Sequence, residues 1–178
     1  MQSLNDPQRQ SAKHRFLHRR GKHTVQDEKG RLPRNRYEMI AMPDNVVLDS
    51  SIIAAIFFPE KITGKCLDIA ENNDCTTVDL AFAETANVAW KRVQQAGQDP
   101  EIVKSSLSEC HAFIGETCQV IPGYDVISEA YDLACSHRIT VYDALFLAAA
   151  VQRGSSLVTA DTKLGNAGRK LVKVELVR

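Results

Sequence analysis

Residues 45–59 read NVVLDSSIIAAIFFP. The β-branched run before Asp49 is typical of a strand buried in a parallel sheet, and the apolar run after it, stopped by Pro59, predicts a short helix. Residues 156–161, SLVTAD, repeat the pattern of an apolar strand followed by an acid. In open α/β sheets the functional crevice lies beyond the carboxyl ends of the strands. We therefore expect Asp49 and Asp161 to face one cleft.

The chain after residue 44 alternates strand and helix patterns. This alternation predicts an α/β fold with three layers, α/β/α, around a central parallel sheet of about five strands. The expected strands cover residues 45–48, 75–78, 118–121, 157–159 and 172–177. The expected helices cover residues 50–58, 60–72, 80–95, 100–116, 124–136 and 142–153, and a last one begins at residue 162. Asp79 is placed to cap the third of these helices.

The opening 44 residues differ in composition from the rest of the chain. They are polar, carry an excess of Lys and Arg over acids, and show neither helical nor strand periodicity. Because such a segment cannot bury enough apolar surface to order itself, we expect residues 1–44 to be a basic, disordered extension and residues 45–178 to form one domain. No apolar segment of a secretory signal follows the basic residues. The longest apolar run, residues 144–151, is far shorter than the ~20 residues of a membrane span.

The cysteines are odd in number, scattered and without a C-x-x-C pair. They are Cys66, Cys75, Cys110, Cys118 and Cys135. This pattern argues against a disulfide framework. We expect small buried side chains in a cytoplasmic protein, where thiols stay reduced.

Two further acids, Glu84 and Asp143, fall on predicted helices. Glu84 and Asn87 are three residues apart and so share a helix face. Four carboxylates gathered in one cleft repel one another and require a cation or raised pKa values. Oxygen ligands without His or Cys favour Mg²⁺ or Mn²⁺. Such ions suit phosphodiester hydrolysis, because they activate a water and neutralise phosphate charge.

Each acid also has a simpler interpretation. Asp49, Asp143 and Asp161 all stand where a predicted helix begins, so each is also explained as a cap or as a favourable charge for the helix dipole. Glu84 alone is an ordinary exposed helix acid. Capping explains these acids one at a time. It does not explain acids at two strand ends together with the Glu84 and Asn87 pair.

The four stretches that carry these acids occur in a recognisable order: VVLDSS (46–51), E-x-x-N (84–87), YDA (142–144) and LVTAD (157–161). They resemble the four acidic motifs of PIN-domain ribonucleases. Among these, their pattern is most similar to that of the VapC-type toxins of prokaryotic toxin–antitoxin pairs. The resemblance covers about residues 45–177. It implies that the catalytic, metal-binding acids are Asp49, Glu84, Asp143 and Asp161, with Ser50, Asn87 and Thr159 as supporting polar residues.

This resemblance implies a hydrolase, an endoribonuclease that uses Mg²⁺ (or Mn²⁺) to cut RNA. It also implies a homodimer and a cognate antitoxin as protein partner, with no role for a membrane. The alternative is a catalytically silent PIN-like module that binds RNA or protein, against which the intact acids argue. A haloacid-dehalogenase-type phosphatase fits poorly, because Ser51 stands where a second Asp is needed.

Two predictions concern the surface. Phosphate contacts dominate nucleic-acid affinity, so an acidic domain needs local cations to hold RNA. The candidates for such a basic rim are Lys91, Arg92, Lys163, Arg169 and Lys170, with ordinary solvated charges as the alternative. For a protein partner, the candidate surface is residues 52–58 with the following helix, because their continuous hydrophobicity exceeds what one buried face needs. The alternative, favoured for each residue taken singly, is burial in the core.

Overall fold

A computed structural model gives the structure of residues 44–178. The predicted extension therefore falls, apart from Asp44, outside the described residues and stays a prediction. No helix in the described part of the chain has the length and hydrophobicity needed to cross a lipid bilayer.

The centre of the domain is a five-stranded sheet. Its strands are β1 (Asn45–Leu48), β2 (Asp74–Val78), β3 (Gln119–Ile121), β4 (Ser156–Thr159) and β5 (Val174–Leu176). They lie in the order β3-β2-β1-β4-β5, and all neighbouring pairs are parallel. The strands β2 and β3 lie on one side of β1 in the sheet, and β4 and β5, which come later in the chain, lie on its other side. The sheet thus reverses its order between β1 and β4, which is where ligand crevices form in such sheets.

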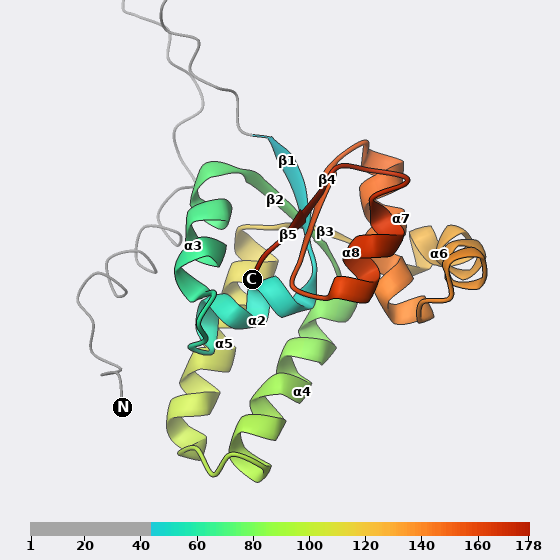
Figure 1. Ribbon diagram of the computed structural model, residues 1–178. Coiled ribbons are helices and arrows are strands. Elements are labelled where there is room, and N and C mark those ends of the chain that lie inside the picture. Colours follow the sequence, from blue (N-terminus) through green and yellow to red (C-terminus); the bar gives the residue numbers. More distant parts are fainter. Residues whose placement is uncertain (1–43) are drawn as a thin grey trace, which may run out of the picture. The chain divides into compact units, whose positions relative to one another are not determined.

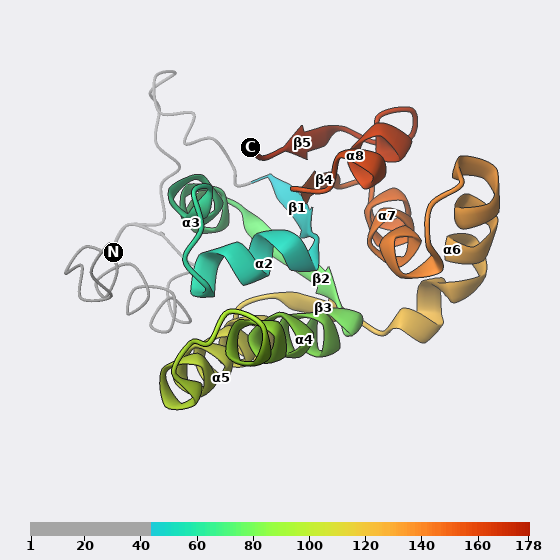
Figure 2. The same cartoon turned by 60° about the horizontal axis from the view of Figure 1, so that its bottom comes forward.

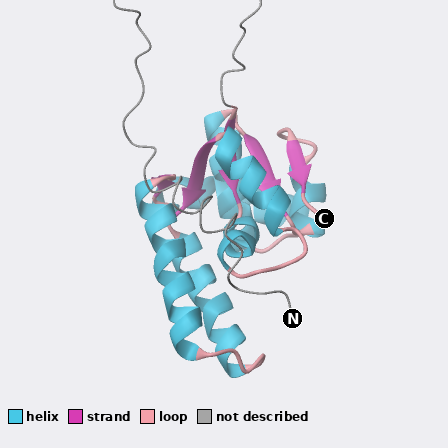
Figure 3. Ribbon diagram, turned by 90° about the vertical axis from the view of Figure 1, so that its left-hand side faces the viewer, coloured by secondary structure: helices cyan, strands magenta, loops and turns pink. Residues whose placement is uncertain are grey.

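Helices cover both faces of the sheet. They are α2 (Ser50–Phe57), α3 (Thr63–Asn72), α4 (Leu80–Gln94), α5 (Pro100–Glu116), α6 (Gly123–His137), α7 (Val141–Arg153) and α8 (Thr162–Gly168). In Figure 2, α2 to α5 lie on one side of the sheet and α6 to α8 on the other. The helices α4 and α5 form a long antiparallel pair that extends beyond the sheet (Figure 1 and Figure 3). The predicted three-layer α/β/α fold with a parallel sheet of about five strands is confirmed.

Helix α2 belongs to the core, which is the alternative favoured for each of its residues taken singly, and it does not form an exposed docking surface. Every residue from Ile52 to Phe58 is buried. The reason is that α3, α4, α5 and β4 all pack against α2. The ring of Phe57, for example, meets that of Phe113 on α5 with centroids 5.6 Å apart. The prediction of a partner surface on residues 52–58 is therefore wrong, and the alternative of burial in the core is confirmed.

Asp79 is another departure from expectation. It precedes α4 but its side chain does not cap that helix, because its backbone is already helical (φ −57°, ψ −24°) and a capping side chain needs an extended backbone. Its Oδ1 instead accepts a hydrogen bond from the N–H of Gly123 at 2.9 Å. This bond joins the end of β2 to the start of α6.

The cysteines largely follow the prediction. Cys66, Cys75, Cys110 and Cys118 are buried, and no disulfide joins the cysteines of the described region. Burial raises the pKa of Cys66 to about 11 and that of Cys75 to about 12. These thiols are therefore uncharged near neutral pH and act as small hydrophobic side chains. Cys135 is the exception, because it lies on the exposed side of α6.

Candidate active site

The side chain of Asp49 is fixed at the carboxyl end of β1. It is only 5% exposed. Its carboxylate accepts hydrogen bonds from three hydroxyls: Ser51 at 2.7 Å, Thr159 at 2.7 Å and Ser50 at 3.3 Å. Although Asp49 occupies the cap position of α2, it makes no side-chain cap bond. The simpler interpretation of Asp49 as a helix cap therefore fails.

Two of these hydroxyls also bind the backbone that follows β4. Thr159 Oγ1 accepts from the N–H of Asp161 at 2.9 Å, and Ser51 Oγ accepts from the N–H of Ala160 at 3.1 Å. Each hydroxyl thus donates its proton to the carboxylate of Asp49 and accepts a backbone proton in return. The ends of β1 and β4 are locked together around this carboxylate. The supporting residues predicted from the sequence include Ser50 and Thr159 but not Ser51. The Ser50-Ser51 pair directly after Asp49 was the signal in the sequence that could have identified it.

Asp143 lies in the first turn of α7 and is half-buried. Thr140 caps this helix by accepting from the N–H of Asp143 at 3.1 Å, and the Thr140 hydroxyl donates to Asp143 Oδ2 at 2.7 Å. The cap of α7 is therefore Thr140, and Asp143 in the first turn is placed as a favourable charge for the helix dipole, as the simpler interpretation has it. Sequence reasoning did not single out Thr140, although Thr three residues before an acid is a known capping pattern.

Glu84 lies on α4 and is partly buried. Burial raises the pKa of Glu84, the charges of Asp49 and Asp143 raise it further, and a hydrogen bond from Ser50 lowers it. Burial also raises the pKa of Asp49, with hydrogen bonds from Ser51 and Thr159 opposing this and the Asp143 charge adding to it. Carboxylates from β1, α4 and α7 thus lie within electrostatic reach of one another. Asn87, one turn further along α4, is exposed.

Asp161 behaves differently from these three acids. It is exposed and caps α8, because its Oδ1 accepts from the N–H of Leu164 at 2.8 Å. The simpler interpretation of an acid as a helix cap is therefore realised here. The cap uses Oδ1, so Oδ2 takes no part in it.

The donor set fits a hard divalent cation. Within residues 44–178, no three His, Cys, Asp or Glu side chains form a preformed metal-binding group. Mg²⁺, however, usually binds through one or two carboxylates and keeps several waters, so it does not require a complete protein cage. Asp49 supplies one fixed carboxylate, and Glu84 and Asp143 supply negative charge nearby. Burial, and to a smaller degree repulsion among these acids, raises the pKa values of Asp49 and Glu84, and a cation here would offset both effects.

Comparison with known proteins agrees with this description. The PIN domain family model matches residues 46–170, a span that contains all four acids. The chain is 32% identical over 120 residues to Ribonuclease VapC3 from Pyrobaculum aerophilum, which covers 67% of this chain and 91% of that relative.

Two solved structures share the fold. PAE2754 from Pyrobaculum aerophilum has a TM-score of 0.57 at 20% identity, over 80% of this chain and 92% of that one. VapBC2 from Rickettsia felis, solved bound to a DNA fragment from its promoter, has a TM-score of 0.54 at 17% identity, over 75% and 99%. Together with the family match, these findings show that the chain belongs to the PIN-domain family.

Proposed function

We propose that this chain is a metal-dependent endoribonuclease that hydrolyses RNA phosphodiester bonds. The observation that carries the proposal is the buried carboxylate of Asp49, held by three hydroxyls at the point where the sheet reverses its order. The chain's 32% sequence identity to a protein named as a ribonuclease supports the same activity. A carboxylate kept buried without capping a helix costs free energy unless a cation or hydrogen bonds offset the burial.

The residues proposed to hold Mg²⁺ or Mn²⁺ are Asp49, Glu84, Asp143 and Asp161. When bound, such an ion supplies a Lewis acid and a water with a lowered pKa. Ser50, Ser51 and Thr159 would keep the Asp49 carboxylate in one orientation, so that no reorganisation is needed when the substrate binds. Asn87, exposed one turn from Glu84, is proposed to contact substrate or a bound water.

We further propose that the chain is the toxin of a toxin–antitoxin pair. The order of its acidic motifs and its identity to Ribonuclease VapC3 support this role. It would then act in the cytoplasm as a homodimer and would be silenced by a cognate antitoxin. Because α2 is buried, the antitoxin must bind outside residues 52–58.

A second candidate function is a catalytically silent PIN-like module that binds RNA or protein. The observations in its favour are that Asp161 caps α8 and that the described acids do not form a preformed metal group. The buried and hydroxyl-bound Asp49 argues against it, because a binding module has no need of a fixed, desolvated carboxylate.

An RNA cleavage assay distinguishes the two. The full-length protein is incubated with tRNA, rRNA and synthetic single-stranded RNA, in Mg²⁺, Mn²⁺ or EDTA, beside the Asp49→Asn variant. The matched control is Asp79→Asn, which changes an acid at the end of the neighbouring strand β2. We expect discrete cuts that need metal, vanish in Asp49→Asn and persist in Asp79→Asn. Bound but uncut RNA would support the binding module.

A further inference from the structure

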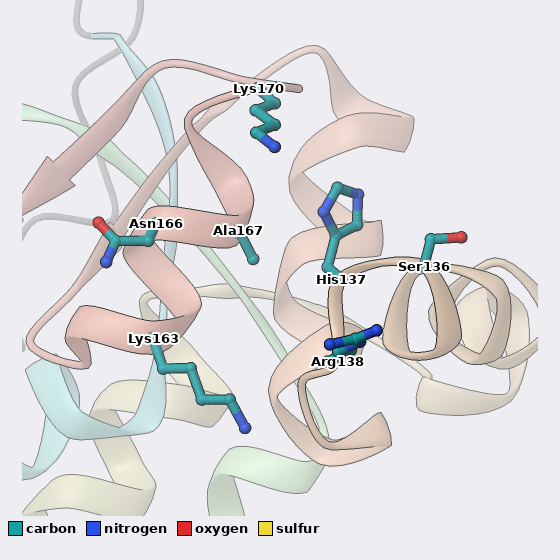
Figure 4. Close-up of a pocket in the computed structure, with 7 residues that line it drawn as sticks. All are labelled: Ser136, His137, Arg138, Lys163, Asn166, Ala167 and Lys170. Atoms are coloured by element: carbon teal, nitrogen blue, oxygen red, sulfur yellow. The ribbon is translucent and has the colours of Figure 1, made fainter.

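A pocket of about 310 Å³ lies between the C-terminal end of α6 and helix α8 (Figure 4). Lys163 and Lys170 project from one wall, and His137 and Arg138 stand on the other. None of the described residues that line the pocket is acidic. The pocket is thus a concentration of positive charge in a domain that otherwise carries more acids than Lys and Arg.

The three permanent cations of this pocket have no carboxylate partner among residues 44–178. The ion pairs formed within that range join Arg92 to Glu60 and Lys173 to Asp44. Because Arg138, Lys163 and Lys170 line one small volume, their charges repel one another unless an anion lies between them. The pocket therefore favours an anionic ligand.

The backbone of Arg138 points to the same conclusion. Arg138 ends α6 in the left-handed conformation (φ 56°, ψ 41°), and it is the one non-glycine residue of the described chain with a positive φ. Helix α7 ends in nearly the same conformation at Gly154 (φ 59°), the residue type that adopts it without cost. Non-glycine residues held in such strained conformations cluster at ligand-binding and active sites.

Both walls of the pocket lie close along the chain to residues of the candidate active site. Lys163 is two residues from Asp161, and two Cα–Cα steps span at most about 7 Å. Arg138 is two residues from Thr140, whose hydroxyl binds Asp143 at 2.7 Å. A chain of phosphates that enters the acidic site therefore has this pocket within reach.

We propose that the pocket binds a backbone phosphate of the RNA next to the one that is cut. This inference rests on the proposed function. Arg138 would bind the phosphate through its planar guanidinium, and Lys163 and Lys170 would act as point charges. Phosphate contacts position a nucleic acid without reading its sequence, so the pocket sets affinity and register. Of the five cations predicted to form a basic rim, Lys163 and Lys170 line this pocket, whereas Arg92 is paired with Glu60.

The salt dependence of RNA binding tests this directly. Binding of a fluorescein-labelled single-stranded RNA to the full-length protein is measured by anisotropy in EDTA, from 50 to 200 mM KCl. For Lys163→Gln with Lys170→Gln, we expect the slope of log affinity against log salt to be shallower by about 1.4, so that the fourfold rise in salt costs about sevenfold less affinity than in wild type. The control, Lys61→Gln with Lys104→Gln, removes two exposed charges elsewhere and should keep the wild-type slope. Equal slopes in both double variants would overturn the proposal.

Arg138→Gly provides a second test, because it should change the thermal stability and the RNA affinity of the protein differently. Glycine is favoured in the left-handed conformation, so the Tm should hold or rise, while RNA affinity falls about tenfold. If the RNA is cut, KM should rise with kcat unchanged. A lower Tm with unchanged affinity would show that Arg138 serves the fold only.

The outcomes separate this proposal from the proposed function. RNA that is bound through the pocket but never cut would refute the ribonuclease and leave the pocket in place. RNA that is cut with equal slopes would refute the pocket and leave the ribonuclease in place. Calorimetric binding of inorganic phosphate at the pocket without any binding of RNA would reassign it to a small anion, which also overturns the proposal.

Discussion

Asp49 and Asp161 follow neighbouring parallel strands and both precede a helix, yet their side chains do different things. Their backbones are similar, with φ −69° and ψ 153° at Asp49 and φ −79° and ψ 118° at Asp161. Asp161 caps its helix, whereas Asp49 is buried and accepts three hydroxyl hydrogen bonds instead. The hydroxyls around each acid, and not its place between strand and helix, therefore decide which hydrogen bonds its carboxylate makes.

The largest effect is expected from Asp49→Asn. The amide oxygen can still accept hydroxyl protons, so the fold and the Tm should be retained. Removing even an outer-shell partner of a metal typically costs 10–100-fold, so loss of the anchoring carboxylate should lower the cleavage rate more than about 100-fold. The measurement is single-turnover RNA cleavage with a parallel thermal melt. An unfolded variant would show that Asp49 serves the fold, and a variant that cuts RNA normally would show that its carboxylate is not needed for cleavage.

The next effect concerns the hydroxyl that joins the two acids. Thr159→Val removes a donor to Asp49 and the acceptor for the Asp161 N–H. We expect a loss of about 1–3 kcal/mol in the free energy of unfolding and a 10–100-fold loss of cleavage.

The control for this change is Thr77→Val. Thr77 is as buried as Thr159, but its hydroxyl donates to the Leu48 carbonyl and not to an acid. It should lose similar stability, measured by urea unfolding, with its cleavage rate unchanged. If both variants lost cleavage equally, the hydroxyl of Thr159 would have no special link to Asp49.

The smallest effect separates the two roles proposed for Asp161. Asn caps a helix about as well as Asp, so Asp161→Asn should melt like the wild type but cut more slowly, because the negative charge is gone. Asp161→Ala should lose the cap as well, about 1 kcal/mol, or a Tm lower by ~4 °C. Thermal melts and cleavage rates of both variants give the answer. Normal cleavage in Asp161→Asn would reduce this residue to a cap.

Much of this comparison was predictable from local sequence. Val46 and Val47 before Asp49, and Leu157 and Val158 near Asp161, indicate buried parallel strands, and parallel strands bring their carboxyl ends to one edge. The link between Asp49 and Thr159 crosses 110 residues and depends on how closely β1 and β4 approach. For the same reason, the sequence did not show that the Ser51 hydroxyl also binds the backbone N–H of Ala160, although its position two residues from Asp49 was a local signal for the bond to the carboxylate.

Other features depend on tertiary packing that no local pattern contains. The hydrophobicity of residues 52–58 fits an exposed docking helix as well as a core helix, and packing of α4 and α5 over it decides for the core. Asp79 looks like a cap, but the position of Gly123 at the next helix gives its side chain another partner. The pocket around Arg138 joins segments whose proximity follows from the packing of α6 and α8 on α7.

The central claim is that Asp49 anchors a divalent metal ion, and calorimetric titration of Mn²⁺ into the full-length protein tests it most directly. The titration compares the wild type with Asp49→Asn and with Asp79→Asn, each checked by a thermal melt. We predict that the wild type and Asp79→Asn bind Mn²⁺ and gain about 2.7 kcal/mol of stability at 100 times the dissociation constant. Asp49→Asn should bind more than about 100-fold more weakly. Equal binding by all three proteins would contradict the account.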